Sequence, residues 1–306
     1  MLQATHLFIK QILTFGKFQS SQIPKSVFSE LLTEFTNIKN KDVIVIPEFI
    51  KKFAKGDWTL IVDETINGKY GLKHITRKLK ILNNGGYCFG YKIVLFLLNK
   101  DNLTIPIGFG FYHKDSESVS EITLNFLRIL RNNFKVRPKI FVADGAYDVD
   151  KLIKRLTDYG WACIIRCRSS RVLSKNKIKK LIPRGFGDAQ GELRNKTKVK
   201  IFRRKDRFFI GNRMLMSMKK AVSYYKRRWK VEESFRFLKS CIGIKRCQQH
   251  RTIFQEIFIW MCLIAFAYFS YQESISGNSI YKLYDNVIFG FQDFDLSLLK
   301  EVLDMN

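Results

Sequence analysis

The feature that most constrains the fold of this chain is a series of short apolar runs, the later of which alternate with amphipathic segments. The runs are rich in β-branched and aromatic side chains, as strands are. The amphipathic segments space their apolar residues as helices do, and one begins with the capping pattern S-x-x-E at Ser118–Glu121. We predict strands at 58–66, 87–98 and 105–112, a helix at 116–134, a strand at 139–143, a helix at 148–159 and a strand at 161–167.

This order of elements indicates how the sheet is built. Three strands in succession favour an antiparallel meander, and strand–helix–strand units favour parallel additions to it. We therefore predict an α/β fold with a mixed sheet and helices on its faces. Residues 168–217 have a different texture, with many lysines and short strand candidates at 198–203 and 207–211, and we interpret them as a β-rich insertion.

The remaining segments frame this core. Residues 1–56 look loosely amphipathic and are predicted to form a small helical N-terminal region, either a DNA-binding module or a packing subdomain. The core is predicted to span residues 57–272, and residues 273–306 form a C-terminal tail with a short helix. The apolar run Ile257–Phe269 is too short to cross a bilayer and is predicted to be a buried helix.

The net charge of the chain indicates which kinds of partner it binds. Lysine and arginine number 54 against 27 acids, for a formal net charge of +27. Such an excess favours a polyanion, with nucleic acid as the first candidate and an anionic membrane surface as a weaker one. The basic residues are densest between Arg166 and Arg251. Without a signal-peptide pattern or a spanning segment, we expect a cytoplasmic protein, and the six cysteines, which lack a CxxC pair, fit that reducing compartment.

Three acids are candidates for a metal site. Asp63 and Asp144 each end an apolar run, and a carboxylate at the end of a buried strand needs a partner, a capping role or a metal. Glu232 lies in Ser223–Ser240, which has no glycine or proline and is predicted to be one helix of about five turns. Two Mg²⁺ ions can bind the attacking and leaving oxygens of a phosphoryl transfer, which requires acids from neighbouring elements to converge.

One stripe of that helix carries Tyr225, Arg228, Glu232 and Lys239, because these positions fall close together at 100° per residue. The simpler alternative is a basic amphipathic helix stabilised by an Arg228–Glu232 pair. Two neighbouring acids are set aside. Glu64 should face away from Asp63 on the strand, and Glu233 should lie off the stripe.

The spacing Tyr225-x2-Arg228-x3-Glu232-x6-Lys239 resembles the YREK motif of DDE transposases from bacterial insertion sequences. Asp63 in LIVDETI resembles the first catalytic aspartate of that family, and Asp144 in FVADGAYD resembles the second. The resemblance covers roughly residues 57–272. It implies an RNase H-like catalytic core, in which a β-rich insertion before the glutamate helix is also typical of the YREK branch.

The resemblance also implies an activity. Asp63, Asp144 and Glu232 would hold two Mg²⁺ or Mn²⁺ ions, while Tyr225, Arg228 and Lys239, with Trp229 in a less defined role, would contact DNA. The reaction would be hydrolysis at the element's inverted-repeat ends, followed by transfer of the freed 3′-hydroxyl into target DNA. The partners would be double-stranded DNA and a second copy of the chain, in the nucleoid of a prokaryotic cell, with no membrane.

Two alternatives stay open. Family members often carry a longer N-terminal domain that recognises the inverted repeats, whereas about 56 residues precede the first core strand here. A decayed or truncated transposase that binds DNA without cutting it is therefore one alternative. An RNase H-fold nuclease that cuts DNA without joining it is the other, and the YREK spacing argues against it.

Overall fold

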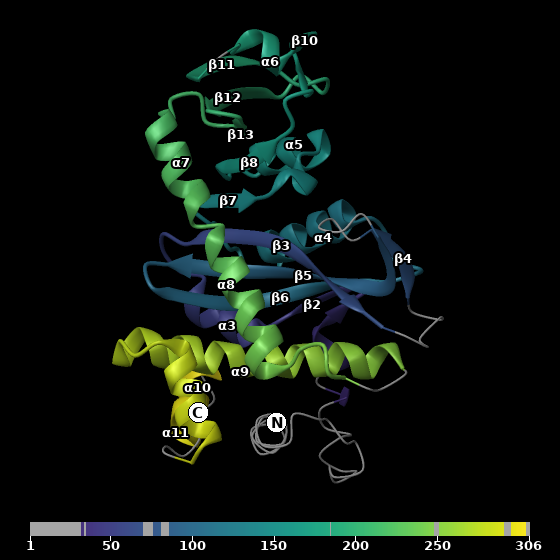
Figure 1. The fold of residues 1–306 in the computed structure, drawn as a ribbon, viewed down its shortest axis with the longest axis vertical. Helices are drawn as coiled ribbons and strands as arrows, with labels where there is room; N and C mark the ends of the chain where they lie inside the picture. The colour runs from purple at the N-terminus through teal and green to yellow at the C-terminus, as the bar shows by residue number, and fades with distance from the viewer. Residues whose placement is uncertain are drawn as a thin grey trace.

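The computed structural model describes residues 32–33, 35–69, 76–80, 86–183, 185–247, 251–290 and 295–303. Its main feature is a large mixed sheet with helices packed around it (Figure 1). The strands of this sheet are β1 (Lys39–Asn40), β2 (Val43–Val45), β3 (Thr59–Gly68), β4 (Arg77–Lys80), β5 (Tyr87–Lys100), β6 (Leu103–Tyr112), β7 (Ile140–Ala143), β8 (Cys163–Cys167), β11 (Phe186–Glu192), β12 (Lys198–Arg204) and β13 (Arg207–Gly211).

The order of the strands is β1-β2-β6-β5-β3-β7-β8-β13-β12-β11, and β4 pairs with the first residues of β5. β3, β5 and β6 form the antiparallel meander that their succession predicts. β7 and β8 then add in parallel beyond β3. The predicted α/β fold, a mixed sheet flanked by helices, is confirmed.

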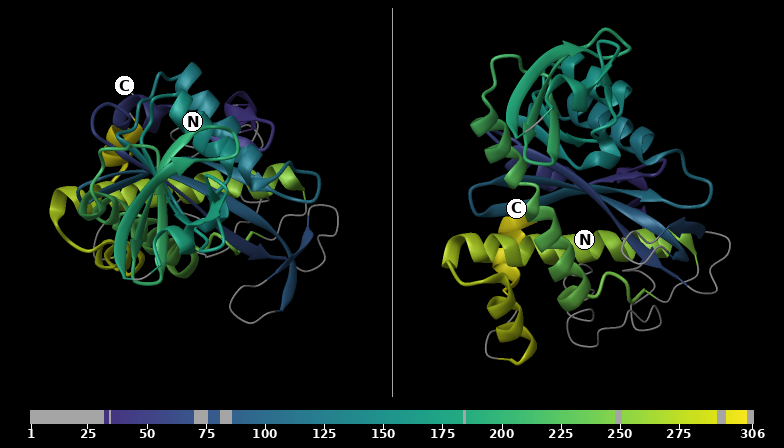
Figure 2. Two further views of the ribbon diagram at one scale, coloured as in Figure 1. Left: turned by 90° about the horizontal axis from the view of Figure 1, so that it is seen from above. Right: turned by 45° about the horizontal axis from the view of Figure 1, so that its top comes forward.

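The residues of the predicted insertion continue this sheet. β13 pairs antiparallel with β8, and β12 and β11 extend it further. The short strands β9 (Val172–Leu173) and β10 (Asn176–Lys177) form a separate pair. Buried residues of the insertion, such as Leu173 and Ile201, belong to the same core cluster as the meander. This end of the molecule lies at the top of Figure 1 and comes forward in the right-hand view of Figure 2.

The helices cover the sheet. They are α3 (Pro47–Phe53), α4 (Val119–Asn132), α5 (Asp150–Asp158), α6 (Ile178–Leu181), α7 (Met218–Lys226), α8 (Trp229–Phe237), α9 (Thr252–Ser276), α10 (Ile280–Ile288) and α11 (Leu296–Leu303). α4 and α9 pack against β6, and α8 packs against β3 and β5. At the start of α4 the Ser118 hydroxyl accepts a hydrogen bond from the Glu121 amide, as the capping pattern predicts.

β7 and β8 are buried on both faces, which explains why their sequences are apolar without alternation. Phe141 and Ile165 face the main core, which also contains buried residues of α5. Val142 and Ile164 face a second, smaller core that includes Ala221 of α7. Helices therefore pack on both faces of these strands, next to the end of β7.

α9 is the one helix among the described residues that is long and apolar enough to cross a membrane. In its most apolar window, however, 83% of the residues are buried inside the protein, as in a core helix. Tyr91 of β5 donates a hydrogen bond to Gln255 of this helix, and Ser270 donates one to the Thr104 carbonyl of β6. The buried helix predicted over Ile257–Phe269 is therefore present and longer than expected.

The ends of the chain differ in part from the sequence expectations. Of residues 1–56, predicted to be helical, residues 1–31 and 34 lie outside the described residues. The described remainder contains helix α3 together with β1 and β2, which join the sheet through pairing of β2 with β6. At the other end the tail contains two helices, α10 and α11. Leu299 and Val302 of α11 are fully buried, so this helix packs into the core.

The predicted continuous helix at Ser223–Ser240 is wrong in one respect. α7 ends at Lys226 and α8 begins at Trp229, and the last five residues, Leu238–Ile242, wind as a π-helix. Around the junction the backbone bonds tighten, so that the Arg228 amide bonds to the Tyr225 carbonyl, three residues back. The bend lets α7 pack on β7 and β8 while α8 reaches β3, and no glycine or proline marks it in the sequence.

Candidate active site

The site begins with the register of two parallel strands. Val62 of β3 pairs with Ala143 of β7, so Asp63 and Asp144 come next, side by side, as the strands separate. β3 continues to Gly68 on β5, so Asp63 lies within the strand and not at its end as predicted. The Asp144 carboxylate is also held in place. Asp144 Oδ1 accepts a hydrogen bond of 2.8 Å from the Ala146 amide, which fixes its carboxylate at the start of a 3₁₀ turn.

Glu64 joins this pair, contrary to the sequence expectation. One carboxylate oxygen each of Asp63, Glu64 and Asp144 lies within 4.8 Å of the others. Lys92 of β5 holds one oxygen of Glu64 at 2.9 Å. Because side chains alternate along a strand, the Cβ atoms of Asp63 and Glu64 point to opposite faces. The longer side chain of Glu64 nevertheless brings its carboxylate close to that of Asp63. No sequence signal indicates this.

Two buried polar atoms beside the acids lack partners. Neither Glu64 Oε2 nor the Tyr147 hydroxyl makes a hydrogen bond of good geometry to a described residue, although the phenol lies close enough to the Glu64 carboxylate for this contact to raise the pKa of Tyr147. Burial raises the pKa of the Tyr147 phenol, and the neighbouring Glu64 and Asp63 raise it further. Unpaired oxygens next to clustered carboxylates suit a site that a cation completes.

Arg228 connects Glu232 to this cluster. Its Nη1 atom lies 2.7 Å from Asp63 Oδ2, and its Nη2 atom pairs with Glu232 Oε1 one helical turn later. Within the described residues, Glu232 is not one of the acids whose oxygens lie together. The structure thus brings Asp63 and Asp144 together, as predicted, and joins Glu232 to Asp63 through a guanidinium.

The other residues of the predicted stripe surround Arg228. The Arg228 guanidinium lies 5.7 Å from the centre of the Tyr225 ring, which packs on Phe209 at 4.7 Å. Lys239, in the π-helical turn, lines the same groove as Asp63. Trp229, in contrast, is 52% exposed. The stripe therefore persists through the bend, with Tyr225 anchored in the smaller core.

The site opposes the ionised form of its two aspartates. Burial raises the pKa of Asp63 to about 7, the nearby Asp144 raises it as well, and Arg228 lowers it only in part. Burial also raises the pKa of Asp144. Burial, and then Lys245, lower the pKa of Lys239. A bound divalent cation would relieve the strain of holding Asp63 and Asp144 ionised together.

The acids lie in a groove of about 1300 Å³. Small-molecule pockets are usually about 300–1,000 Å³, so this one suits a larger ligand. Its lining is basic, with seven lysine and arginine side chains that surround the acids: Lys78, Lys80, Lys92, Arg166, Arg168, Lys239 and Lys245. A basic groove that is also lined by clustered acids fits a polyanion whose backbone reacts at those acids.

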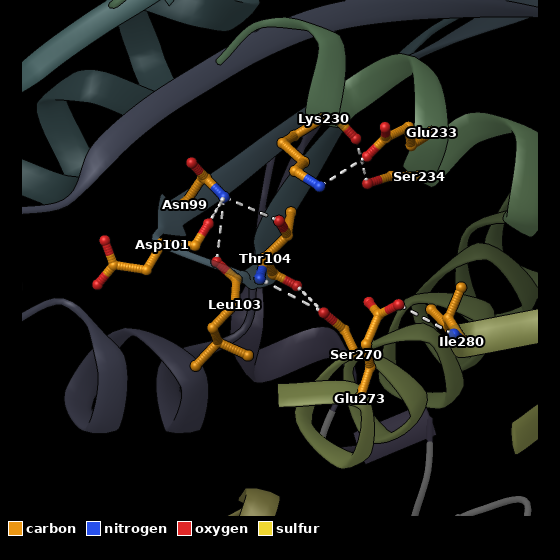
Figure 3. A network of polar contacts seen from close by, with 10 residues as sticks. All are labelled: Asn99, Asp101, Leu103, Thr104, Lys230, Glu233, Ser234, Ser270, Glu273 and Ile280. Carbon is orange, nitrogen blue, oxygen red and sulfur yellow. Dashed lines mark hydrogen bonds and ion pairs between the residues drawn. The ribbon is translucent and has the colours of Figure 1, made fainter. Parts of the chain in front are cut away.

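Glu233 lies elsewhere, as its position off the stripe predicts. It pairs with Lys230 at 2.9 Å, and Figure 3 shows both side chains near the turn between β5 and β6. In that turn Asn99 donates to Thr104, whose backbone bonds to Ser270 of α9. Lys230, Glu233 and Ser234 of α8 line one pocket with Thr104 and Ser270, so Glu233 lies outside the acidic cluster.

The sequence of the chain matches the family model of the transposase DDE domain over residues 54–268. The chain belongs to the DDE transposase family. The residues matched include Asp63, Asp144, the glutamate helix and most of α9. The acidic cluster of this transposase is consistent with an enzyme of that family.

One solved structure supports the fold. The piggyBac transposase, in a synaptic complex with hairpin DNA, matches this transposase with a TM-score of 0.52 at 10% identity, over 99% of this chain and 72% of that one. Human Endonuclease V matches at 13% identity over 70% of this chain and 99% of that one, with a TM-score of 0.32. The NurA nuclease from Sulfolobus solfataricus matches at 8% identity over 89% and 100%, with a TM-score of 0.29. The latter two scores are too low to support an argument. Among curated proteins, no sequence matches the transposase significantly.

Proposed function

We propose that this transposase cuts DNA at the ends of its own element and joins the freed 3′-hydroxyl to target DNA. One observation carries the proposal. The parallel register of β3 and β7 sets Asp63 beside Asp144 in the lining of a basic groove. Hydrolysis and joining are both phosphoryl transfers, so one set of acids serves both.

The proposed cofactors are two Mg²⁺ or Mn²⁺ ions. Asp63 and Asp144 would hold them, with Glu232 as the third acid. The residues fit such ions, because buried carboxylates with raised pKa values and an unpaired oxygen on Glu64 favour a hard cation. When bound, the ions would activate the attacking oxygen and stabilise the leaving one.

The chain's own residues would position the DNA. Arg228 would pair with a phosphate and release Asp63 and Glu232 from its guanidinium, and Lys239 would contact a further phosphate from the groove wall. Tyr225 would support Arg228 from beneath. Trp229, half-exposed beside Arg228, would contact the DNA end. This arrangement supports assignment to the YREK branch of insertion-sequence transposases.

The assembly and its setting follow from the reaction. Joining requires two element ends in one complex, so we propose that two copies of the chain act together on double-stranded DNA. The net charge of +27 supports stable association with DNA. A place in a prokaryotic nucleoid follows if the element is a bacterial insertion sequence.

The test is incubation of the purified chain with DNA that carries the element's ends, in Mg²⁺ or in EDTA. We expect cleaved and joined products in Mg²⁺ and neither in EDTA. Cleavage without joining would indicate a nuclease. DNA binding without cleavage, in Mg²⁺ and in Mn²⁺, would contradict the proposal and indicate a DNA-binding protein.

A further inference from the structure

A short hairpin beside the groove presents two exposed aromatic rings. β4 pairs antiparallel with the start of β5, with Lys78 opposite Phe89 and Lys80 opposite Tyr87. Opposite residues of an antiparallel pair, and alternate residues of a strand, point to the same face. Lys78, Lys80, Tyr87 and Phe89 therefore share one face, which we name the hairpin face.

The hairpin face is open. Tyr87 is 60% exposed and Phe89 is 59% exposed. Leu79, which points to the other face, is buried. Figures 1 and 2 show β4 at the margin of the molecule. Exposing large rings forgoes the stabilisation that their burial would give, and neighbouring exposed rings commonly mark a binding surface.

The position of the lysines indicates what binds there. Lys78 and Lys80 line the same groove as Asp63 and Asp144. The Lys78 ammonium also lies 4.7 Å from the centre of the Tyr87 ring. A polyanion in the groove would thus reach the hairpin face, where the two lysines of β4 lie opposite the two rings of β5. That combination binds unpaired nucleotides, since lysines pair with phosphates and aromatic rings stack on bases.

Paired DNA fits this face less well. The bases of a duplex are stacked on one another about 3.4 Å apart and offer their faces to no side chain. Tyr87 and Phe89 are two positions apart on a strand, or about 7 Å. Two rings at that spacing can each take one base only where the bases are already unstacked.

We propose that the hairpin face binds unpaired nucleotides of the DNA strand that enters the catalytic groove, with bases on Tyr87 and Phe89 and phosphates on Lys78 and Lys80. This inference rests on the proposed DNA substrate. It adds an interaction that favours strands opened near the cleavage site.

The experiment compares two DNAs in EDTA, a full duplex and a duplex of equal length with a short unpaired flank that contains 2-aminopurine. For the wild-type chain we expect tighter binding of the flanked DNA and quenched 2-aminopurine fluorescence. Tyr87→Leu and Phe89→Leu keep an apolar side chain but remove the ring. Each should weaken binding of the flanked DNA about tenfold and restore fluorescence, with less than a twofold change for the duplex.

Two further variants sharpen the test. Phe186→Leu removes an equally exposed ring on β11, the last strand of the sheet, and should not change the binding of either DNA. The double variant Lys78→Gln, Lys80→Gln should weaken binding of the flanked DNA. It should also reduce the slope of log affinity against log salt by about 1.4, or 0.7 for each single-strand phosphate that is no longer neutralised.

The inference is overturned if the Tyr87→Leu and Phe89→Leu variants, with unchanged melting temperatures, bind both DNAs as the wild type does or bind both equally more weakly. A shift from dimer to monomer in these variants, without a change for flanked DNA, would assign the face to a second copy and also overturn it. Wild-type cleavage of a fully paired substrate in Mg²⁺ is measured separately. If the wild type does not cleave this substrate, the proposed function is rejected. If it does cleave, and the ring variants give either of the contrary results above, only the role of the hairpin face is rejected.

Discussion

Asp63→Asn is expected to abolish Mg²⁺-dependent cleavage while the chain remains folded. Cleavage should fall by about 10³-fold or more, because ligation of the catalytic cation contributes several kcal/mol to the transition state. The fold should tolerate the change. Burial and Asp144 raise the pKa of Asp63 to about 7, so its ionised form destabilises the folded state as the pH rises through that value. At pH 8 the asparagine variant should therefore melt no lower than the wild type.

Asp101→Asn provides the matched control. Asp101 is exposed in the turn between β5 and β6, with a φ of 52° that asparagine also tolerates. This variant should cleave at the wild-type rate in a gel assay at pH 8. Undiminished cleavage by Asp63→Asn would remove Asp63 from the catalytic site. If cleavage were lost and the melting temperature also fell greatly, unfolding would explain the lost cleavage. That result would contradict the expected stability of the variant.

Arg228→Gln is expected to have opposite effects on cleavage and on metal binding. Without DNA the guanidinium neutralises Asp63 and Glu232. Its removal frees each acid from a charge-assisted hydrogen bond and should strengthen Mn²⁺ binding by about tenfold. Cleavage should fall at least a hundredfold, because a phosphate would lose its bidentate partner. Titration calorimetry without DNA and a cleavage assay measure the two effects.

Arg228→Lys separates charge from geometry. An ammonium keeps the charge but cannot bridge two carboxylates as the planar guanidinium does. We therefore expect intermediate Mn²⁺ binding and impaired cleavage. If Arg228→Gln weakened Mn²⁺ binding, the guanidinium would be a support for the acids and not a competitor of the cation, contrary to this account.

The sequence predicts the core of the fold well because each core strand is buried on at least one face. The run KIFVA before Asp144 and the run LIV before Asp63 are apolar and short, so both indicate strands, although β3 continues past Asp63 to Gly68. Their parallel order follows from the helix between them, and their register then sets the two aspartates together. These two candidate residues needed no information beyond local pattern and topology.

Other features depend on tertiary packing and leave no local mark. The bend between α7 and α8 arises because two sections of one helical segment pack on different strands. Glu64 reaches the acids through the length of its side chain, against the alternation of the strand. Likewise, β2 pairs with β6 over a long sequence separation, so a region with a helical pattern contributes strands to the sheet.

The most direct test of the central claim is an anomalous-scattering measurement on crystals of the chain with cleaved end DNA and Mn²⁺. The account predicts manganese between Asp63 and Asp144, with Glu232 also bound and the Arg228 guanidinium on a DNA phosphate. Manganese held by Asp63, Glu64 and Asp144, with Glu232 still paired to Arg228, would contradict the assignment of Glu232. The absence of manganese from Asp63 and Asp144 would contradict the account as a whole.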